Sequence, residues 1–389
     1  MTPTALFDPA VHEALIDEPW HAGRVRAAIS AIVDDAEAAF DDGWPTHPVD
    51  SESPEDDARR FRTVYLGGAG VVQALDALQR RRLAELRRDY VPYLEQPYVP
   101  EFPQYDHERS LWMGETGILL VLQRLAPSAE NADRLETLIR ANVEDERCEL
   151  MWGSPGTMLA AGALHELSGE ERWLELWRES ASWLRGQWDS ETDLWTQRLY
   201  GNVDQLTGPA HGFAGCVLAL SLNADEELHR RAATAVRRYA VEENGLANWP
   251  PDMSQEGLVS PRGQIRVQWC HGAPGIVASL ASLAPGDDEH ERLMVAGGEL
   301  TWRSGPLTKG ANLCHGTGGN GYAFLALFQR TGDELWLDRA RAFAMHAAAQ
   351  VEHAREQYGR GRYTLWTGDP GTALYLADCL DGSFELPLP

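Results

Sequence analysis

The stretch "HGAPGIVASLASL", residues 271–283, decides the fold because its pattern recurs along the whole chain. Two glycines three positions apart open an apolar segment that is long enough to form a helix. The same G-x-x-G opening recurs seven times at spacings of 39 to 60 residues, and self-similarity at such a period is typical of repeat architectures. The first glycines of the seven copies are Gly67, Gly114, Gly153, Gly212, Gly272, Gly316 and Gly368.

Amphipathic segments lie between the apolar ones. In "ERWLELWRESASWLRGQW" (171–188) apolar residues recur every three or four positions and the opposite face is charged, which predicts a helix with one wet face. Each repeat is therefore a helical hairpin, and a closed ring encloses the apolar helices where an open solenoid would expose them. We predict an all-α fold, an α/α toroid of seven hairpins. It forms a single domain over 1–389, with a helical extension at 1–60 and repeats starting near 61, 108, 148, 205, 265, 310 and 363.

The glycine pairs indicate where the functional end of this ring lies. Glycine permits tight turns and close approach of backbones, so each G-x-x-G sets the N-terminus of an inner helix at the same end of the ring. Helix N-termini carry exposed N–H groups and a partial positive charge. Thiolates and other anions are stabilised there.

Two of the five cysteines stand in identical tripeptides, Cys-His-Gly, at Cys270 and Cys314. Each precedes an inner helix, and the two repeats are consecutive, so in a closed ring the two thiols are neighbours. Two thiolates and one imidazole make a soft tetrahedral zinc site with its fourth position open, which is the arrangement of catalytic zinc. A histidine follows each cysteine, so the residues alone leave the third ligand open between His271 and His315. The alternative to a metal site is that both cysteines are small hydrophobic residues of the core.

Composition excludes several classes of function. A net charge of −25 argues against nucleic acid as a partner, because binding to phosphates needs a basic patch. No apolar run approaches the length of a membrane span, and the N-terminal residues do not form a signal peptide. We therefore expect a cytoplasmic protein with no membrane span, whose cysteines serve as ligands or core residues and not as a disulfide framework.

The residues W-C-H-G-A-P-G (269–275), C-H-G-T-G-G-N-G (314–321) and the sevenfold G-x-x-G resemble the lanthionine synthetase C-like (LanC-like) family. The resemblance runs from about Phe61 to Cys379. It implies an α/α toroid that holds one Zn²⁺ per chain and forms thioether bonds. Carried over residue by residue, it implies the zinc ligands Cys270, Cys314 and His315.

The resemblance also marks residues outside the metal site. His211, in "GPAHGFAG" (208–215), matches a proton-transfer histidine, and Arg266 matches an arginine that faces negative charge developing on the substrate. His271 stands where peptide cyclases usually carry tyrosine, and Glu149 where they usually carry aspartate. Both choices are similar to the eukaryotic-type branch, whose members resemble glutathione-using enzymes. Glu149 either orients His211 or caps a helix, and either His211 or His271 returns the proton.

The function predicted on this basis is zinc-dependent addition of a thiol, from a peptide cysteine or from glutathione, to dehydroalanine or dehydrobutyrine residues. The partners would be a dehydrated peptide and a dehydratase or kinase that prepares it. One alternative is a non-catalytic module that binds zinc and a thiol or glutathione. Another is a toroidal glycosidase, which needs two catalytic carboxylates at the mouth of the ring, where Glu115, Glu149 and Asp369 are the candidates.

Overall fold

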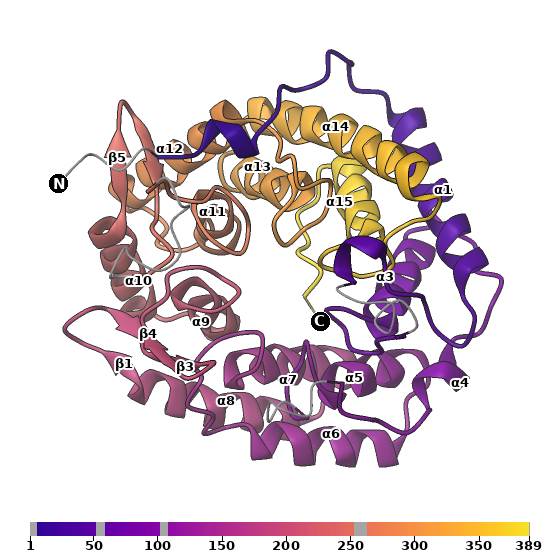
Figure 1. Ribbon diagram of the computed structural model, residues 1–389. Helices are drawn as coiled ribbons and strands as arrows, with labels where there is room; N and C mark the ends of the chain where they lie inside the picture. Colours follow the sequence, from indigo (N-terminus) through magenta and orange to yellow (C-terminus); the bar gives the residue numbers. More distant parts are fainter. Residues whose placement is uncertain (1–5, 52–58, 102–107, 253–262, 389) are drawn as a thin grey trace.

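The computed structural model describes residues 6–51, 59–101, 108–252 and 263–388, and these form a closed double ring of helices (Figure 1). Within them, each inner helix begins directly after the first glycine of a G-x-x-G copy, as the sequence predicts. The inner helices are α3 (Gly68–Arg80), α5 (Glu115–Leu125), α7 (Ser154–Ser168), α9 (Phe213–Leu220), α11 (Ala273–Leu280), α13 (Thr317–Thr331) and α15 (Asp369–Asp381). Each packs against the next, and α15 packs against α3, so the ring closes.

The second glycine of each motif is required by close contact with the loop that precedes its helix. A Cβ atom on Gly275 would lie 1.8 Å from the carbonyl oxygen of Trp269, and one on Gly319 would lie 1.7 Å from that of Leu313. The other five copies show the same clash with the carbonyl six residues earlier. Only glycine lets the entry loop fold back on the first helical turn, which keeps all seven entry loops at one end of the toroid.

The outer layer carries the amphipathic segments. All eight residues of α11 are buried, whereas an outer helix such as α10 buries only one side. The outer helices are α1 (Ala22–Ala39), α4 (Val91–Leu94), α6 (Ala129–Ala141), α8 (Glu171–Gly186), α10 (Glu226–Tyr239), α12 (Asp288–Ser304) and α14 (Glu334–Tyr358).

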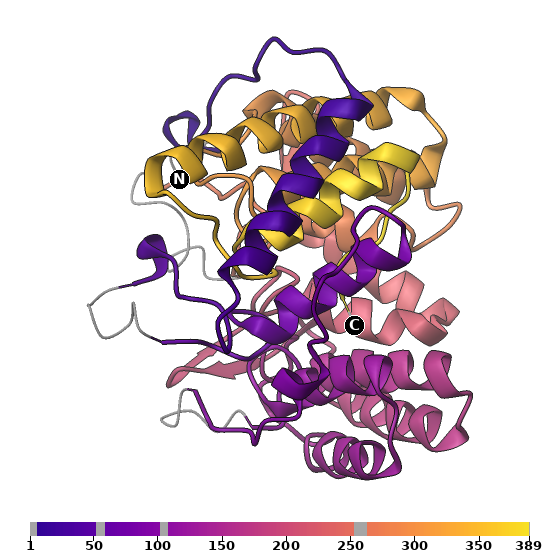
Figure 2. The same cartoon turned by 90° about the vertical axis from the view of Figure 1, so that its right-hand side faces the viewer.

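The outer layer is less regular than seven equal hairpins. The position after α3 holds only α4, a single turn in a proline-rich stretch where proline removes backbone donors. The N-terminal helix α1 instead packs against α14 and α15 and covers the last inner helix from outside (Figure 2). The part of the chain expected as an extension thus supplies an element of the outer ring.

The loops between the helices contain short 3-10 helices and strands. The 3-10 helices are η1 (Pro9–Val11), η2 (Pro48–Asp50) and η3 (Ser221–Asn223). Three antiparallel hairpins are formed by β1 (Trp188–Asp189) with β2 (Leu194–Trp195), β3 (Gln197–Leu199) with β4 (Asn202–Asp204), and β5 (Val241–Glu243) with β6 (Leu246–Asn248).

Three tryptophans fill the middle of the ring at its entry-loop end. Trp112, Trp269 and Trp366 precede α5, α11 and α15, which are not neighbours in the ring, yet the indole of Trp366 lies 4.6 Å from that of Trp112 and 4.5 Å from that of Trp269 between centroids. All three are at most 1% exposed. The centre is therefore packed core, and the entry loops rest on a rigid aromatic floor.

Candidate metal centre

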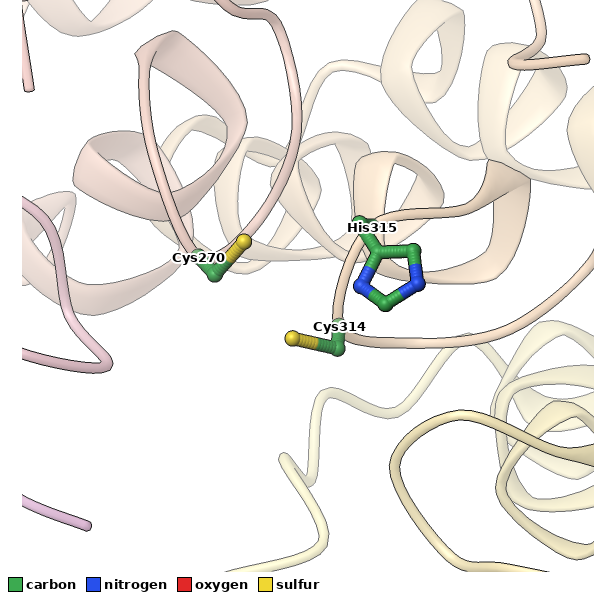
Figure 3. Close-up of side chains that lie close together, drawn as sticks. All are labelled: Cys270, Cys314 and His315. Carbon is green, nitrogen blue, oxygen red and sulfur yellow. The ribbon is translucent and has the colours of Figure 1, made fainter. Parts of the chain in front are cut away.

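The backbone ties the two cysteine loops together. The N–H of Cys270 donates to the carbonyl of Cys314 at 3.0 Å, and the N–H of Cys314 donates to the carbonyl of Trp366 at 2.8 Å. These bonds join the entry loops of α11, α13 and α15, so the two thiols are brought together by neighbouring repeats as the sequence predicts (Figure 3).

Cys270, Cys314 and His315 form a cluster in which one ligand atom from each residue lies within 4.8 Å of the others. Both cysteines are buried and His315 is partly exposed, so the group opens on one side. Two sulfur atoms and one imidazole nitrogen are the donors that zinc prefers, and three donors leave a position for a further ligand. The donor set thus fits zinc. In the described parts of the chain, no other group of His, Cys, Asp and Glu side chains meets this criterion.

Neighbouring polar groups hold the donors in place. The hydroxyl of Tyr65 donates to Cys314 Sγ at 3.0 Å, and the amide of Gln268 donates to Cys270 Sγ at 3.1 Å. Asn312 Oδ1 accepts from the backbone N–H of His315 at 3.0 Å. Such outer contacts orient ligands and tune their basicity.

The two thiols share their protons unequally. A hydrogen bond from Cys314 lowers the pKa of the Cys270 thiol well below its usual range, against the opposing effect of burial. The same bond, with burial, raises the pKa of Cys314. The pair therefore favours a thiolate on Cys270 over one on Cys314, and a thiolate is the form that binds a metal cation.

His271 does not join the cluster, although it follows Cys270. It is 8% exposed, and its backbone N–H and carbonyl both pair with Gln268 at 3.1 Å. Burial lowers the pKa of His271 to about 4, so the ring is neutral at pH 7. Its Nδ1 is buried without a hydrogen-bond partner, which leaves an acceptor or donor available on that side.

His211 and Glu149 form a buried hydrogen-bonded pair. Nδ1 of His211 lies 2.8 Å from Oε2 of Glu149, whose side chain is fully buried. Burial lowers the pKa of His211, but the hydrogen bond and charge of Glu149 outweigh it, with help from Cys270, and the net pKa is raised. Because Nδ1 is engaged, Nε2 is the nitrogen that can exchange a proton with a substrate.

Glu149 contacts His211 and the loop that precedes α7. Its carboxylate accepts from the backbone N–H groups of Met151, Trp152 and Gly153 at 2.9, 2.6 and 3.1 Å. These groups lie before Ser154, the first residue of α7, and the helix has no side-chain cap. Of the two alternatives that the sequence left open, the contact with His211 fits the first, and the helix cap is not formed.

Arg266 lies in the entry loop of α11 and is partly buried. Its charge lowers the pKa of His271, which places the guanidinium near that ring. The amide of Asn248 donates to its backbone carbonyl at 3.2 Å.

A cavity of about 490 Å³ is lined in part by Lys309 and Asn312, in the loop that leads to Cys314 and His315. Asn312 both lines it and holds His315, and the charge of Arg362 on its wall acts on Cys314. Lys309 and Arg360, also on the wall, have no carboxylate partner among the described residues, whereas Arg362 pairs with Asp50 at 2.7 Å. The carboxylates of Glu13 and Asp369 line the same cavity, so its wall carries both cationic and acidic side chains.

Sequence reasoning missed Tyr65, Gln268, Asn312 and this pocket. Tyr65 stands two residues before Gly67, the place that Trp112 and Trp366 occupy in their repeats, so alignment of the repeats could have marked it as facing the site. Nothing in the sequence marks Gln268 or Asn312, whose roles depend on how loops fold back.

The carboxylates required by a glycosidase are engaged elsewhere. Glu115 pairs with Arg134 at 2.5 Å, and Asp369 accepts from the backbone N–H of Arg362 at 3.1 Å. Glu149 is bound to backbone N–H groups and His211, so each of the three candidates already has partners in the structure. Among the described helices, none is long and apolar enough to span a bilayer.

Comparison with known proteins gives concordant matches. The model of the family described as "Lanthionine synthetase C-like protein" matches residues 62–386. The LanC-like protein GCL1 of Arabidopsis thaliana is 32% identical over 172 residues, which is 42% of this chain and 38% of that protein. A protein of Danio rerio named glutathione S-transferase LANCL1 is 38% identical over 183 residues, 46% of this chain and 44% of that protein. These matches thus span less than half the length of either relative.

Among solved structures, nisin cyclase superposes with a TM-score of 0.54 at 17% identity, covering 82% of this chain and 94% of that one. At this identity the likeness concerns the fold, and it agrees with the α/α toroid built from the seven glycine-opened helices.

Proposed function

The chain belongs to the lanthionine synthetase C-like family, and on that premise we propose that it adds a thiol to dehydroalanine or dehydrobutyrine residues of a peptide, with zinc. The observation that carries the proposal is the cluster of Cys270, Cys314 and His315 at the entry-loop end of the toroid. Two thiols and an imidazole converging there have no role in glycoside chemistry.

In this proposal Cys270, Cys314 and His315 hold one Zn²⁺ per chain. When bound, zinc lowers the pKa of a substrate thiol in its open position and so supplies a thiolate at neutral pH. Tyr65 and Gln268 support the site by donating to the two cysteine sulfurs.

The remaining chemistry falls to the chain's own side chains. The substrate sulfur forms a bond to the β-carbon, the C=C π bond breaks, and its electron pair moves onto the α-carbon and the adjoining carbonyl. His211, whose protonated form Glu149 stabilises, delivers a proton to the α-carbon through Nε2. Arg266 faces the negative charge that develops on the carbonyl. The proton that the thiol gives up passes to solvent, because His271, with its pKa lowered by burial to about 4, holds a proton poorly at pH 7.

The cavity that Lys309 and Arg360 line favours glutathione as the thiol donor over a cysteine of the same peptide. Glutathione carries two carboxylates and one amino group, and the cavity offers Lys309 and Arg360 for the former beside Glu13 and Asp369 for the latter. An internal peptide cysteine has no carboxylate of this kind. The name of the Danio rerio relative is consistent with the same choice.

Three further points belong to the proposal. Dehydroalanine is not an encoded residue, so a dehydratase, or a kinase followed by elimination, has to prepare the peptide. All five cysteines are free thiols, which suits a reducing compartment and supports the cytoplasm. The inner ring runs from α3 to α15 and α1 completes the outer layer, which supports one domain over 1–389.

The test is incubation of the zinc-assayed protein with a dehydroalanine peptide, with and without glutathione, followed by mass spectrometry. We expect the peptide to gain the mass of one glutathione. Loss of a peptide thiol without mass gain would instead indicate cyclisation. Tight binding of glutathione with no product would favour the second candidate, a zinc and thiol binding module.

A further inference from the structure

The hairpin of β3 and β4 places a tyrosine in a backbone conformation that tyrosine rarely adopts. Leu199 pairs with Asn202, so Tyr200 and Gly201 alone make the turn, and their φ angles are +54° and +83°. Two successive positive φ values define the tight I′ turn of hairpins, whose first position favours asparagine, aspartate or glycine. For a bulky residue the left-handed region is an outlier.

A second hairpin of this chain makes the same turn with residues that favour it. In the hairpin of β5 and β6, Glu243 pairs with Leu246, and the two turn residues are Asn244 and Gly245 with φ of +53° and +78°. These φ angles match those of the first hairpin to within a few degrees, but the first turn residue here is asparagine, which this turn favours. Tyr200 is therefore not required by the turn.

Tyr200 gains little burial in return. Its side chain leaves the residue 57% exposed, one of the larger exposed fractions among the apolar and aromatic residues described. Strained and exposed positions that give nothing to the core are concentrated at functional sites.

The position of the ring suggests what it does. The indole N–H of Trp152 donates to the Tyr200 hydroxyl at 3.0 Å, and the tyrosine ring lies edge-on to the imidazole of His211 with centroids 6.4 Å apart. Trp152 is also the residue whose backbone N–H donates to Glu149 at 2.6 Å. The tip of the hairpin is thus anchored to the loop that orients His211.

The base of the hairpin is fixed to the same loop. Gln197 is fully buried, and its side-chain amide donates to the carbonyl of Cys148, the residue before Glu149, at 3.0 Å. Its Oε1 accepts from the N–H of Leu206 at 2.8 Å, in the entry loop that carries His211. Both ends of the hairpin are therefore hydrogen-bonded to the loops that carry Glu149 and His211.

We propose that Tyr200 is a positioning residue of the thioether-forming site, held in a strained turn so that its ring covers His211 and fixes the imidazole against Glu149. The inference rests on the proposed function. It adds a residue from outside the glycine-opened repeats and gives the hairpin a role in proton transfer.

Tyr200→Asn tests this, because it installs the residue that the second hairpin uses. We expect the unfolding midpoint to rise by about 1–2 °C as the strain is relieved. We expect kcat for thiol addition to fall about tenfold, since the imidazole loses its fixed orientation, with KM for glutathione unchanged. Zinc content should stay at the wild-type level.

A second readout does not depend on turnover. Modification of His211 by diethyl pyrocarbonate, followed by peptide mass spectrometry, should become severalfold faster in Tyr200→Asn because the covering ring is gone. The matched control is Asn244→Tyr, which places the strain in the other hairpin and should lower the midpoint while leaving kcat and His211 reactivity unchanged.

Wild-type kcat and wild-type His211 reactivity in Tyr200→Asn would overturn the proposal. Should that variant not fold, Tyr200→Ala removes the ring and is judged by the same two readouts. If the wild-type protein adds no thiol to any dehydrated peptide, the proposed function fails, while the His211 reactivity still decides whether Tyr200 covers that ring.

Discussion

Cys270-His271-Gly272 and Cys314-His315-Gly316 bring the same three residues to equivalent places in successive repeats, yet the two histidines end in different environments. His315 faces the two sulfurs, whereas His271 is packed away from them. The backbones differ at the glycine, with φ of +108° at Gly272 and −126° at Gly316. We call residues 270–272 the first arm and residues 314–316 the second arm. Both arms place a cysteine in the cluster, but only the second arm also places its histidine there.

The difference comes from what each loop folds against. His271 is pinned by two backbone hydrogen bonds to Gln268, which turns the chain tightly after the cysteine. The N–H of His315 instead bonds to the side chain of Asn312, and this leaves its imidazole directed toward Cys314. The two histidines thus differ in their partners within each loop, although the tripeptide is the same.

The largest effect that we predict comes from removing Cys314, the cysteine of the second arm. Cys314→Ala should lose most of its zinc and all detectable thiol addition, because one of three donors and its bond to Cys270 disappear together. Metal analysis and the mass-spectrometric assay measure both. Cys379→Ala, a fully buried thiol in α15, is the control and should keep zinc and activity. Stoichiometric zinc in Cys314→Ala would refute the site.

Next in size is the effect expected from removing the proposed proton donor, His211, which lies outside both arms. His211→Asn should keep zinc but lose about two to four orders of magnitude in kcat, the usual range for a general acid. His290→Asn, which removes a fully buried histidine in α12, should cost stability and leave kcat near wild type. Zinc loss in His211→Asn would make His211 a ligand and reopen the choice between the two arms.

A smaller effect, with a defined pH signature, is expected for Glu149→Gln. Glu149 raises the pKa of His211 against the effect of burial, so its neutralisation lets that pKa fall. The protonated donor is then lost at lower pH, and the alkaline limb of the pH–rate profile should move to lower pH. Loss of backbone hydrogen bonds at the α7 entry should also cost about 1–3 kcal/mol in the free energy of unfolding.

The control for this shift is Glu115→Gln, at the start of α5. Glu115 pairs with Arg134 and has no contact with His211, so the pH–rate profile should keep its position. Identical profiles for Glu149→Gln and the wild type would mean that the proton comes from another group.

Much of the fold could be predicted because the repeated glycines act locally. Each inner helix begins after the glycine that the pattern marks, since a Cβ at the second glycine would strike the loop carbonyl six residues earlier. The outer layer was less predictable. The place of α1 over α15 and the single turn of α4 depend on packing between distant parts of the chain.

The site divides in the same way. The meeting of Cys270 and Cys314 follows from equivalent places in neighbouring repeats, and the structure brings them together. The choice of His315 came from family resemblance, because the loop partners that direct the two histidines are not visible in the tripeptide. Tyr65 reaches Cys314 across 249 residues of sequence, a contact that only the closed ring creates.

The most direct test of the account is the zinc content of His315→Asn and His271→Asn, purified in parallel. The claim that the second arm supplies the third ligand predicts that His315→Asn loses most of its zinc and that His271→Asn retains about one zinc per chain, as expected for an intact three-ligand site. Retention of zinc in His315→Asn together with its loss in His271→Asn would contradict the claim and reverse the roles of the two arms.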